Sequence, residues 1–136
     1  MTSIRQLPGE PIVIVTLTLP VHEYMEEIGN LNAQIAEIAR HTPGCLYRIS
    51  DASHLDDISF SDILLWLMIQ LEKQAGSIID PRIKPIAVGQ GIMSEAAIRK
   101  VKERFGLEIP MFPTLDQAIQ FARNEIALSE QPCVTD

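Results

Sequence analysis

Two kinds of hydrophobic pattern alternate along the chain. An unbroken β-branched run at residues 12–15 is typical of a strand that is covered on both faces. The next apolar residues recur at steps of four and three, which predicts one buried face of a helix over residues 21–40. That face consists of Tyr24, Ile28, Leu31, Ile35 and Ile38. The segment HTPG at residues 41–44 then ends the helix.

The same alternation continues towards the C-terminus. The sequence predicts three further strands, at residues 45–50, 86–89 and 107–112, and three further helices, at 61–74, 94–105 and 113–128. Gly106 provides the C-terminal stop of the second of these helices. Thr114, with Gln117 three residues later, has the spacing of a capping box. Pro110 cannot donate to a central ladder, so it places the last strand at an edge.

Strand and helix thus alternate four times, with a short additional strand expected within residues 2–7. This order predicts an α/β sandwich, with a mostly parallel sheet of four to five strands and helices on its faces. No repeat or linker divides the chain. We therefore expect a single domain over residues 1–136, with its core at about 10–127 and a flexible tail at 128–136.

Composition narrows the function classes. The 136 residues carry a formal net charge of −7, and Trp66 is the only tryptophan. Nucleic-acid binding is therefore not expected, since it needs a basic footprint or exposed aromatic residues. The most apolar run, at residues 63–71, is too short to span a bilayer. Cys45 and Cys133 form neither a metal-ligand pair nor a disulfide framework, so we expect a buried free thiol at Cys45 and a cytoplasmic location.

Candidate chemistry gathers in the segment between the second predicted strand and the following helix. Serines, acids and one histidine crowd there: Asp51, Ser53, His54, Asp56, Asp57, Ser59, Ser61 and Asp62. Such residues cap helices and form turns without any further function. His54 could serve a nearby serine as a base, and the acids could offer oxygen ligands to Mg²⁺. However, no G-x-S-x-G motif occurs, and the first strand ends without an acidic pair. We therefore expect no catalytic residue, no metal and no cofactor, and a protein that is more readily a binder than an enzyme.

A second candidate is the turn AVGQGIMSE, where Gly89, Gly91 and Ser94 lie between a strand and a helix start. Backbone amides in such a turn can bind an anion. Ser94 stands where a dinucleotide fingerprint needs its third glycine, and the lysine of a P-loop is missing. The alternative is a tight turn in which Gly91 or Ser94 caps the helix.

The stretch ISDASHLDDISFSDILLWL resembles the corresponding loop of STAS domains, the module of sulfate transporters and anti-sigma-factor antagonists. Asp51 and Ser53 match that family's strand-end pair, and Phe60 falls at its phosphorylated serine, with Ser59 and Ser61 on either side. The segment at residues 86–122 resembles the family's closing strand-helix-strand-helix. The resemblance spans about residues 10–127. It implies a non-enzymatic regulator that presents residues 51–62 and the next helix to a partner.

The helix at 61–74 shows no polar side between Ile63 and Leu71. Either its neighbours cover it entirely, or it contacts a partner or a second copy of the chain, with Trp66 as an anchor. We therefore expect a regulatory or protein-interaction module, with a homodimer through this helix as one form. The alternative is a small-ligand or lipid-binding protein with a pocket between this helix and the sheet.

Overall fold

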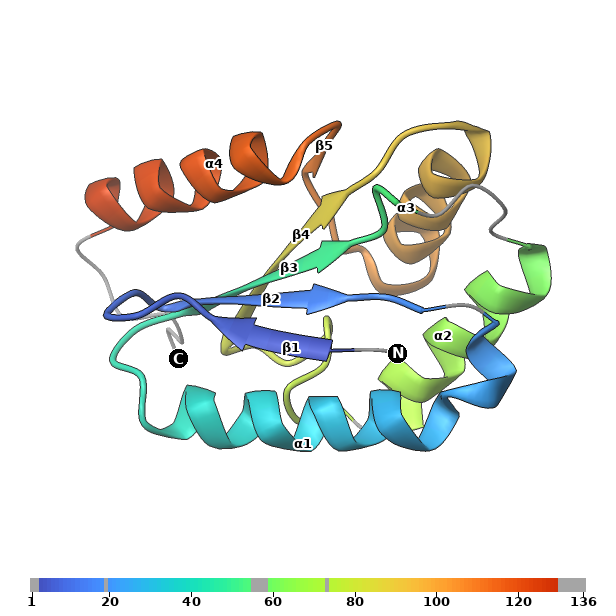
Figure 1. Ribbon diagram of the computed structural model, residues 1–136, viewed down its shortest axis with the longest axis horizontal. Coiled ribbons are helices and arrows are strands. Elements are labelled where there is room, and N and C mark those ends of the chain that lie inside the picture. Colours follow the sequence, from blue (N-terminus) through green and yellow to red (C-terminus); the bar gives the residue numbers. More distant parts are fainter. Residues whose placement is uncertain (1–2, 19, 55–58, 73, 130–136) are drawn as a thin grey trace.

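The computed structural model describes residues 3–18, 20–54, 59–72 and 74–129. Its single five-stranded sheet has the order β1-β2-β3-β4-β5. The strands are β1 (Ser3–Gln6), β2 (Ile12–Thr16), β3 (Leu46–Asp51), β4 (Ile83–Val88) and β5 (Met111–Phe112). β1 pairs antiparallel with β2, and the other neighbours pair in parallel (Figure 1). The predicted α/β architecture with a mostly parallel sheet is confirmed.

Helices cover both faces of the sheet. The helical elements are η1 (Val21–Glu23), α1 (Met25–Arg40), α2 (Phe60–Glu72), α3 (Ile92–Phe105) and α4 (Leu115–Leu128). Val13 and Val15 of β2 pack with α1, whereas Ile12 and Ile14 pack towards α4. Successive strand residues point to opposite faces, so α1 and α4 lie on opposite sides of the sheet. α2 and α3 lie on the same side of the sheet as α1. Ala87 of β4 packs with residues of α2 and α3, whereas its neighbours in the strand face α4.

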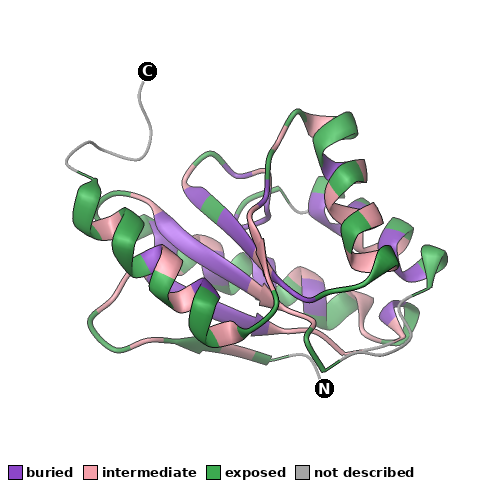
Figure 2. Ribbon diagram, turned by 90° about the horizontal axis from the view of Figure 1, so that it is seen from above, coloured by how far each residue is buried: buried purple, intermediate pink, exposed green. Residues whose placement is uncertain are grey.

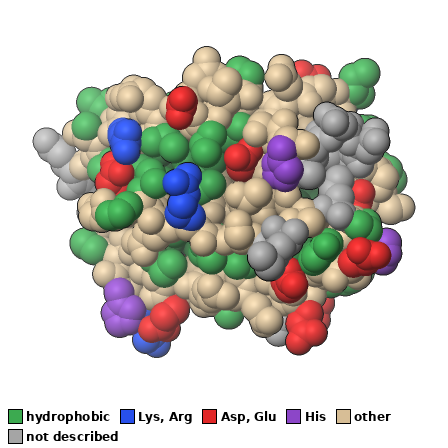
Figure 3. All heavy atoms as spheres, viewed as in Figure 1, with side chains coloured by type: hydrophobic (Ala, Val, Ile, Leu, Met, Phe, Trp, Pro, Cys, Tyr) green, Lys and Arg blue, Asp and Glu red, His purple; other side chains and the backbone are tan. Residues whose placement is uncertain are grey.

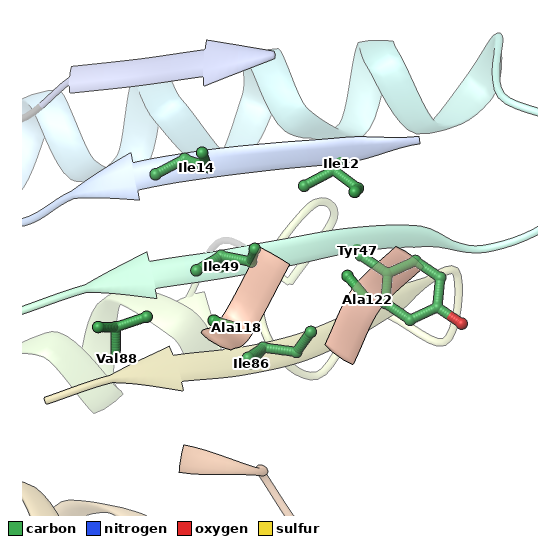
Figure 4. Packing of buried hydrophobic residues seen from close by; sticks show 8 residues of the cluster. All are labelled: Ile12, Ile14, Tyr47, Ile49, Ile86, Val88, Ala118 and Ala122. Atoms are coloured by element: carbon green, nitrogen blue, oxygen red, sulfur yellow. The ribbon is translucent and has the colours of Figure 1, made fainter. Parts of the chain in front are cut away.

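The face under α4 is closely packed and apolar. Figure 4 shows the strand side chains of this core beneath two alanines of α4. Its buried members are Ile12, Ile14, Tyr47, Ile49, Ile86, Val88, Ala118 and Ala122. The small alanine side chains let α4 approach the sheet closely, and burial of each isoleucine contributes about 1.5–3 kcal/mol. Figure 2 shows the buried strands between helices whose outer sides are exposed.

β4 begins three residues earlier than the predicted strand, at Ile83, and includes Pro85. The amides of Ala87 and Gly89 donate to Pro110 and Phe112 on the β5 side. The nitrogen of Pro85 points the same way, since residues i and i+2 share an orientation. β5 pairs only with Ala87 and Val88, so the missing donor of Pro85 falls where no strand needs it.

Helix ends follow the predicted signals in two cases. Thr114 Oγ1 accepts from the Gln117 amide at 3.2 Å, and Gly106 closes α3 in the left-handed conformation with φ 66°. α3 starts at Ile92, with Gly91 at the N-cap position and φ 106°. Ser94 therefore lies within the first turn of α3 and does not cap it.

Cys45 is disulfide-bonded, and the described residues contain no free cysteine. The expectation of a free thiol at this position is therefore wrong. Cys133, the only other cysteine of the sequence, lies outside the described residues. Cys45 therefore gives no support for a reducing compartment.

Polar side chains are buried under α1 and α2. Arg48 is fully buried in the middle of β3, and its Nη1 donates to Asn32 Oδ1 and to the Gly76 carbonyl oxygen, each at 2.7 Å. Its Nε and Nη2 atoms have no hydrogen-bond partner among the described residues. Burial lowers the pKa of the Arg48 guanidinium to about 10. This face of the sheet thus contains a desolvated charge that the α4 face lacks.

Candidate functional site

The loops that follow β2, β3 and β4 meet at the carboxyl edge of the parallel strands. Ligands and partners collect at this edge in open α/β sheets, because helix N-termini converge there. Leu17 follows β2, Ala52 follows β3 and Gly89 follows β4, and the Ala52 amide donates to the Val88 carbonyl oxygen at 2.9 Å. The sheet therefore brings together the two candidate segments that lie far apart in the sequence.

Asp51, Ser53 and His54 have structural partners at this edge. Asp51 Oδ1 accepts from both the amide and the hydroxyl of Ser53, at 3.0 and 2.7 Å, which forms a local turn. His54 Nε2 lies 2.9 Å from the carbonyl oxygen of Leu17. Because a carbonyl oxygen can only accept, Nε2 acts as the donor and cannot be a base in this arrangement. These contacts hold the β3 exit against the β2 exit.

Ser59 and Asp62 form the N-terminal cap of α2. The Asp62 amide donates to Ser59 Oγ at 3.1 Å, and Asp62 Oδ2 accepts from the Ser59 hydroxyl and amide at 2.8 and 3.2 Å. This reciprocal pattern is that of a capping box, with aspartate in the usual place of glutamate. Asp62 Oδ1 also accepts from the Val21 amide at 2.9 Å, so the same carboxylate ties η1 to α2.

Hydrogen bonding determines the charge state of Asp62. Burial by itself would raise the pKa of this carboxyl, but the donors of Val21 and Ser59 outweigh it and hold the pKa below its usual value of 3.8. Asp62 is therefore an anion whose oxygens are occupied by structural donors. Asp56 and Asp57 lie outside the described residues. Among the described residues, no group of three histidines, cysteines or acids could hold a metal ion.

The outward face of α2 carries a row of exposed apolar side chains. Four large hydrophobic residues at steps of four, four and three are 38–57% exposed, and we call them the α2 stripe: Phe60, Leu64, Met68 and Leu71. Ser61 is also exposed in the first turn. Trp66 lies on the inner side, where it packs with residues of η1, α2 and α3. The stripe, and not Trp66, therefore forms the apolar surface that the sequence suggests for this helix.

A cavity of about 100 Å³ lies on the inner side of α2. Residues of η1, α1, α2, α3 and the strands line it, and its wall is almost entirely apolar. The polar exceptions are few: Thr18, Ser50, Asp62, Trp66 and Ser94. None of its described lining residues is a lysine, arginine or histidine. A cavity is thus present between the apolar helix and the sheet, where a small-ligand or lipid-binding protein would need one.

Gly89, Gly91 and Ser94 take different places around this cavity. Gly89 and Ser94 line it, and they are so close that a Cβ on Gly89 would lie 3.2 Å from Ser94 Oγ. The Gly89 amide donates to Phe112 at 2.9 Å, so it is used within the sheet. An anion at this turn would have to rely on the remaining amides at the start of α3.

Sequence reasoning identified the capping residues and, in its ligand-binding alternative, expected a pocket between this helix and the sheet, but it missed the buried guanidinium of Arg48. No single segment signals which residues line the cavity, because they come from many separate segments between Leu17 and Met111. On the face shown in Figure 3, hydrophobic side chains lie between α4 and the strands, and charged side chains are scattered with no broad basic area. None of the helices within the described part of the chain is long and apolar enough to cross a membrane. No family model matches this sequence, and no curated protein matches it either.

Proposed function

We propose that this protein is a non-enzymatic regulatory or protein-interaction module of STAS-like type. In this proposal it presents the 51–62 segment and α2 to a partner protein or to a second copy of itself. The observation that carries the proposal is the α2 stripe, with Phe60 and Met68 more than half exposed at 56% and 57%. Exposed apolar side chains in one continuous row mark interaction surfaces, whereas single scattered ones are normal.

The packing of the inner side of α2 supports the proposal that this helix presents the stripe to a partner. The capping hydrogen bonds of Asp62 fix the first turn of α2 against η1, and Ile63 and Leu67 are buried beneath it. The stripe therefore stands on a helix whose start and orientation are held by the rest of the fold. A preorganised surface binds with a smaller entropic loss than a flexible one.

The size of the stripe limits the kind of contact. A stable interface buries about 800 Å² on each partner, which is more than four side chains provide. A partner must therefore also contact surfaces beside α2, including the exposed start at Ser59 and Ser61. The polar rim around an apolar centre is the usual composition of such an interface.

Phosphorylation of Ser61 is a part of this proposal. The hydroxyl of Ser59 is engaged in the cap of α2, whereas Ser61 is exposed beside Phe60, which occupies the phosphoacceptor position of the STAS resemblance. A phosphate there would add close to two negative charges at a helix N-terminus and change the surface next to the stripe. The test is the intact mass of protein from its own host, where a phosphate should be present in wild type and absent in Ser61→Ala.

Sedimentation velocity tests the contact surface when the partner is a second copy. The variant carries Leu64→Gln and Met68→Gln, and the matched control is Leu128→Gln, an apolar residue of α4 that is 79% exposed. Wild type and the control should associate in the same concentration range, and the double variant should remain monomeric. If the control weakens association as much as the double variant does, the stripe is not the contact surface.

A different partner needs a second test. A photo-reactive residue at position 61 should cross-link one defined protein in the host, and the double variant should lose that adduct. The stripe has no partner role if wild type is monomeric and every adduct persists in the double variant.

The cytoplasmic location stays a prediction, and the disulfide at Cys45 weighs against it because disulfides are rare in reducing compartments. Alkylation of free thiols before lysis, followed by mass spectrometry, measures the state of Cys45 in the host. A fully reduced Cys45 would agree with the cytoplasm, and a fully oxidised one would contradict it.

A further inference from the structure

Small residues line two sides of the cavity behind α2. Ala52 and Gly89, which follow β3 and β4, and Ala87 within β4 line it from the sheet, and Ser94 and Ala97 line it from α3. A Cβ on Gly89 would lie 3.2 Å from Ser94 Oγ, so the sheet and α3 come close together beside the cavity. Larger side chains at these positions would fill the space. The cavity therefore depends on these short side chains, because protein interiors are otherwise closely packed.

The polar groups in the wall offer a ligand little to bind. The oxygens of Asp62 already accept from Val21 and Ser59. Trp66 Nε1 is fully buried, so a molecule in the cavity cannot reach it. The remaining polar side chains carry hydroxyl groups, and none of their oxygens is both buried and without a partner: Thr18, Ser50 and Ser94. A ligand therefore needs no polar atom of its own inside the cavity.

The charge of the wall disfavours ionic ligands. Asp62 is the single ionisable side chain among the described lining residues. An anion would meet this negative charge with no neighbouring cation. A cation would lose its hydration and would find carboxylate oxygens that structural donors already occupy. The wall thus favours a neutral molecule.

The dimensions of the cavity restrict the size of the ligand. A cavity of about 150 Å³ lined by apolar side chains stays dry and holds one benzene ring. The present cavity has a volume of about 100 Å³. It therefore fits a compact hydrocarbon group of about five carbon atoms. Such a group leaves water and gains dispersion contacts with the wall, and both changes favour binding.

We propose that this cavity binds a small aliphatic hydrocarbon group that is neutral and carries no polar atom within the cavity. The proposal goes beyond the interaction function, because it concerns the inner side of α2 and not the stripe. It needs no partner protein and can fail or succeed independently of one.

Three probes with the same five-membered ring test the chemistry of the ligand: cyclopentane, tetrahydrofuran and pyrrolidinium. Cyclopentane should bind in a saturable way. Tetrahydrofuran should bind at least about tenfold more weakly, because its oxygen would be buried without a donor. Pyrrolidinium should not bind, although Asp62 lines the cavity. The proposal is overturned if cyclopentane does not bind, or if either polar ring binds as tightly as cyclopentane.

Isoleucine methyl signals in NMR spectra show where the probe lies. Ile63 of α2 and Ile98 of α3 line the cavity, whereas Ile14 of β2 packs towards α4. Cyclopentane should shift the methyl signals of Ile63 and Ile98 and leave that of Ile14 unchanged. A shift at Ile14 alone, or equal shifts at all three residues, would contradict the proposed site.

Matched variants of α3 test whether the cavity itself is needed. Ala97→Leu fills the cavity and should abolish the saturable binding of cyclopentane. Ala96→Leu makes the same change at the adjacent position, which does not line the cavity, and should leave binding unchanged. Ala97→Val provides a smaller filling if leucine prevents folding, as judged by circular dichroism. Binding that survives in a folded Ala97 variant would place the probe elsewhere and contradict the proposal.

Discussion

The two faces of the sheet are built differently, although adjacent residues of the same strands supply both. The α4 face is a closely packed core of isoleucine, valine, tyrosine and alanine side chains. The opposite face contains the buried guanidinium of Arg48, the orphan donor of Trp66 and a cavity at the carboxyl edge of the strands. Arg48 and Ile49 show the contrast most directly, since they are neighbours in β3 that point to opposite faces. Unsatisfied donors and a cavity lower the stability of the fold, and such a loss is typical of functional regions.

Gly76→Ala should give the largest loss of stability, on the face of the sheet that α1 and α2 cover. Gly76 has φ +80°, and a Cβ there would lie 1.9 Å from the Asn32 carbonyl oxygen and 2.6 Å from the Ala36 amide nitrogen. Both atoms belong to the backbone of α1, so they cannot move aside as a flexible side chain would. We expect a loss of more than about 4 kcal/mol in the free energy of unfolding, or no folded protein.

Gly44→Ala is the matched control for this prediction. It has the same φ of +80°, but a Cβ would meet nothing within 4 Å. It should therefore cost only the backbone term of about 1–2 kcal/mol in urea unfolding. Equal losses for the two variants would show that the close approach to α1 does not matter.

The free energies of unfolding of Ile49→Ala and Arg48→Met compare the two faces of the sheet within one strand. Ile49→Ala opens a hole in the α4 core and should lower the free energy of unfolding by about 2–5 kcal/mol. Arg48→Met removes two hydrogen bonds, but it also removes a desolvated charge and two buried donors without partners. We expect a change of less than about 1.5 kcal/mol in either direction, because these terms offset one another. Denaturant unfolding measures both, and an Arg48→Met loss as large as that of Ile49→Ala would refute the contrast.

Asp62→Asn should have a moderate effect that depends on pH. The pKa of Asp62 is lowered in the folded protein, because its hydrogen bonds outweigh the effect of burial. The stabilising contribution is therefore fully present above the usual value of 3.8 and is lost as pH falls through the lower folded value. At neutral pH the variant should lose about 0.5–2 kcal/mol, the usual range for a lost helix cap.

The difference between wild type and Asp62→Asn should then shrink as pH falls below about 4, since the carboxyl of the unfolded chain begins to protonate there and that of the folded protein follows at lower pH. Thermal unfolding at a series of pH values gives this difference. Asp116→Asn, in the exposed first turn of α4, is the control and should show a smaller effect. A difference for Asp62→Asn that is independent of pH would show that the charge of Asp62 does not stabilise the fold.

The smallest effect on stability is expected for the double substitution in the α2 stripe. Leu64 and Met68 are 40% and 57% exposed, so their replacement by glutamine should change the free energy of unfolding of the monomer by less than about 0.5 kcal/mol for each site. The same variant should lose association. Chemical denaturation at a concentration where wild type is monomeric measures the first quantity. A large loss there would mean that the stripe is part of the core.

Local signals in the sequence were sufficient for most of the fold. The β-branched run of β2, the stop at Gly106 and the cap at Thr114 each act through near neighbours, and the structure confirms them. The start of β4 was missed because Pro85 resembles a connection. Its tolerance in the strand depends on how far β5 extends, which is a tertiary fact.

The site was harder to predict than the fold, because part of it depends on tertiary packing. The capping role of Ser59 and Asp62 follows from a spacing of three residues, whereas the cavity depends on how α2 and α3 settle against three strands. The burial of Arg48 contradicts the usual preference of arginine for the surface. The disulfide at Cys45 depends on contacts that local pattern does not encode. Phe60 and the rest of the stripe are exposed because no other element of the described chain covers them.

Photo-cross-linking from both faces tests the central claim, that the layer containing α2 is the contact surface. One photo-reactive residue replaces Ser61 in α2, and another replaces Asn124, an exposed residue of α4 on the opposite face. In the native host, position 61 should yield a defined adduct with a partner or a second copy, and position 124 should yield none. The adduct at position 61 should disappear when Leu64→Gln and Met68→Gln are added. An adduct formed from position 124 alone, or one at position 61 that ignores the stripe substitutions, would contradict the account.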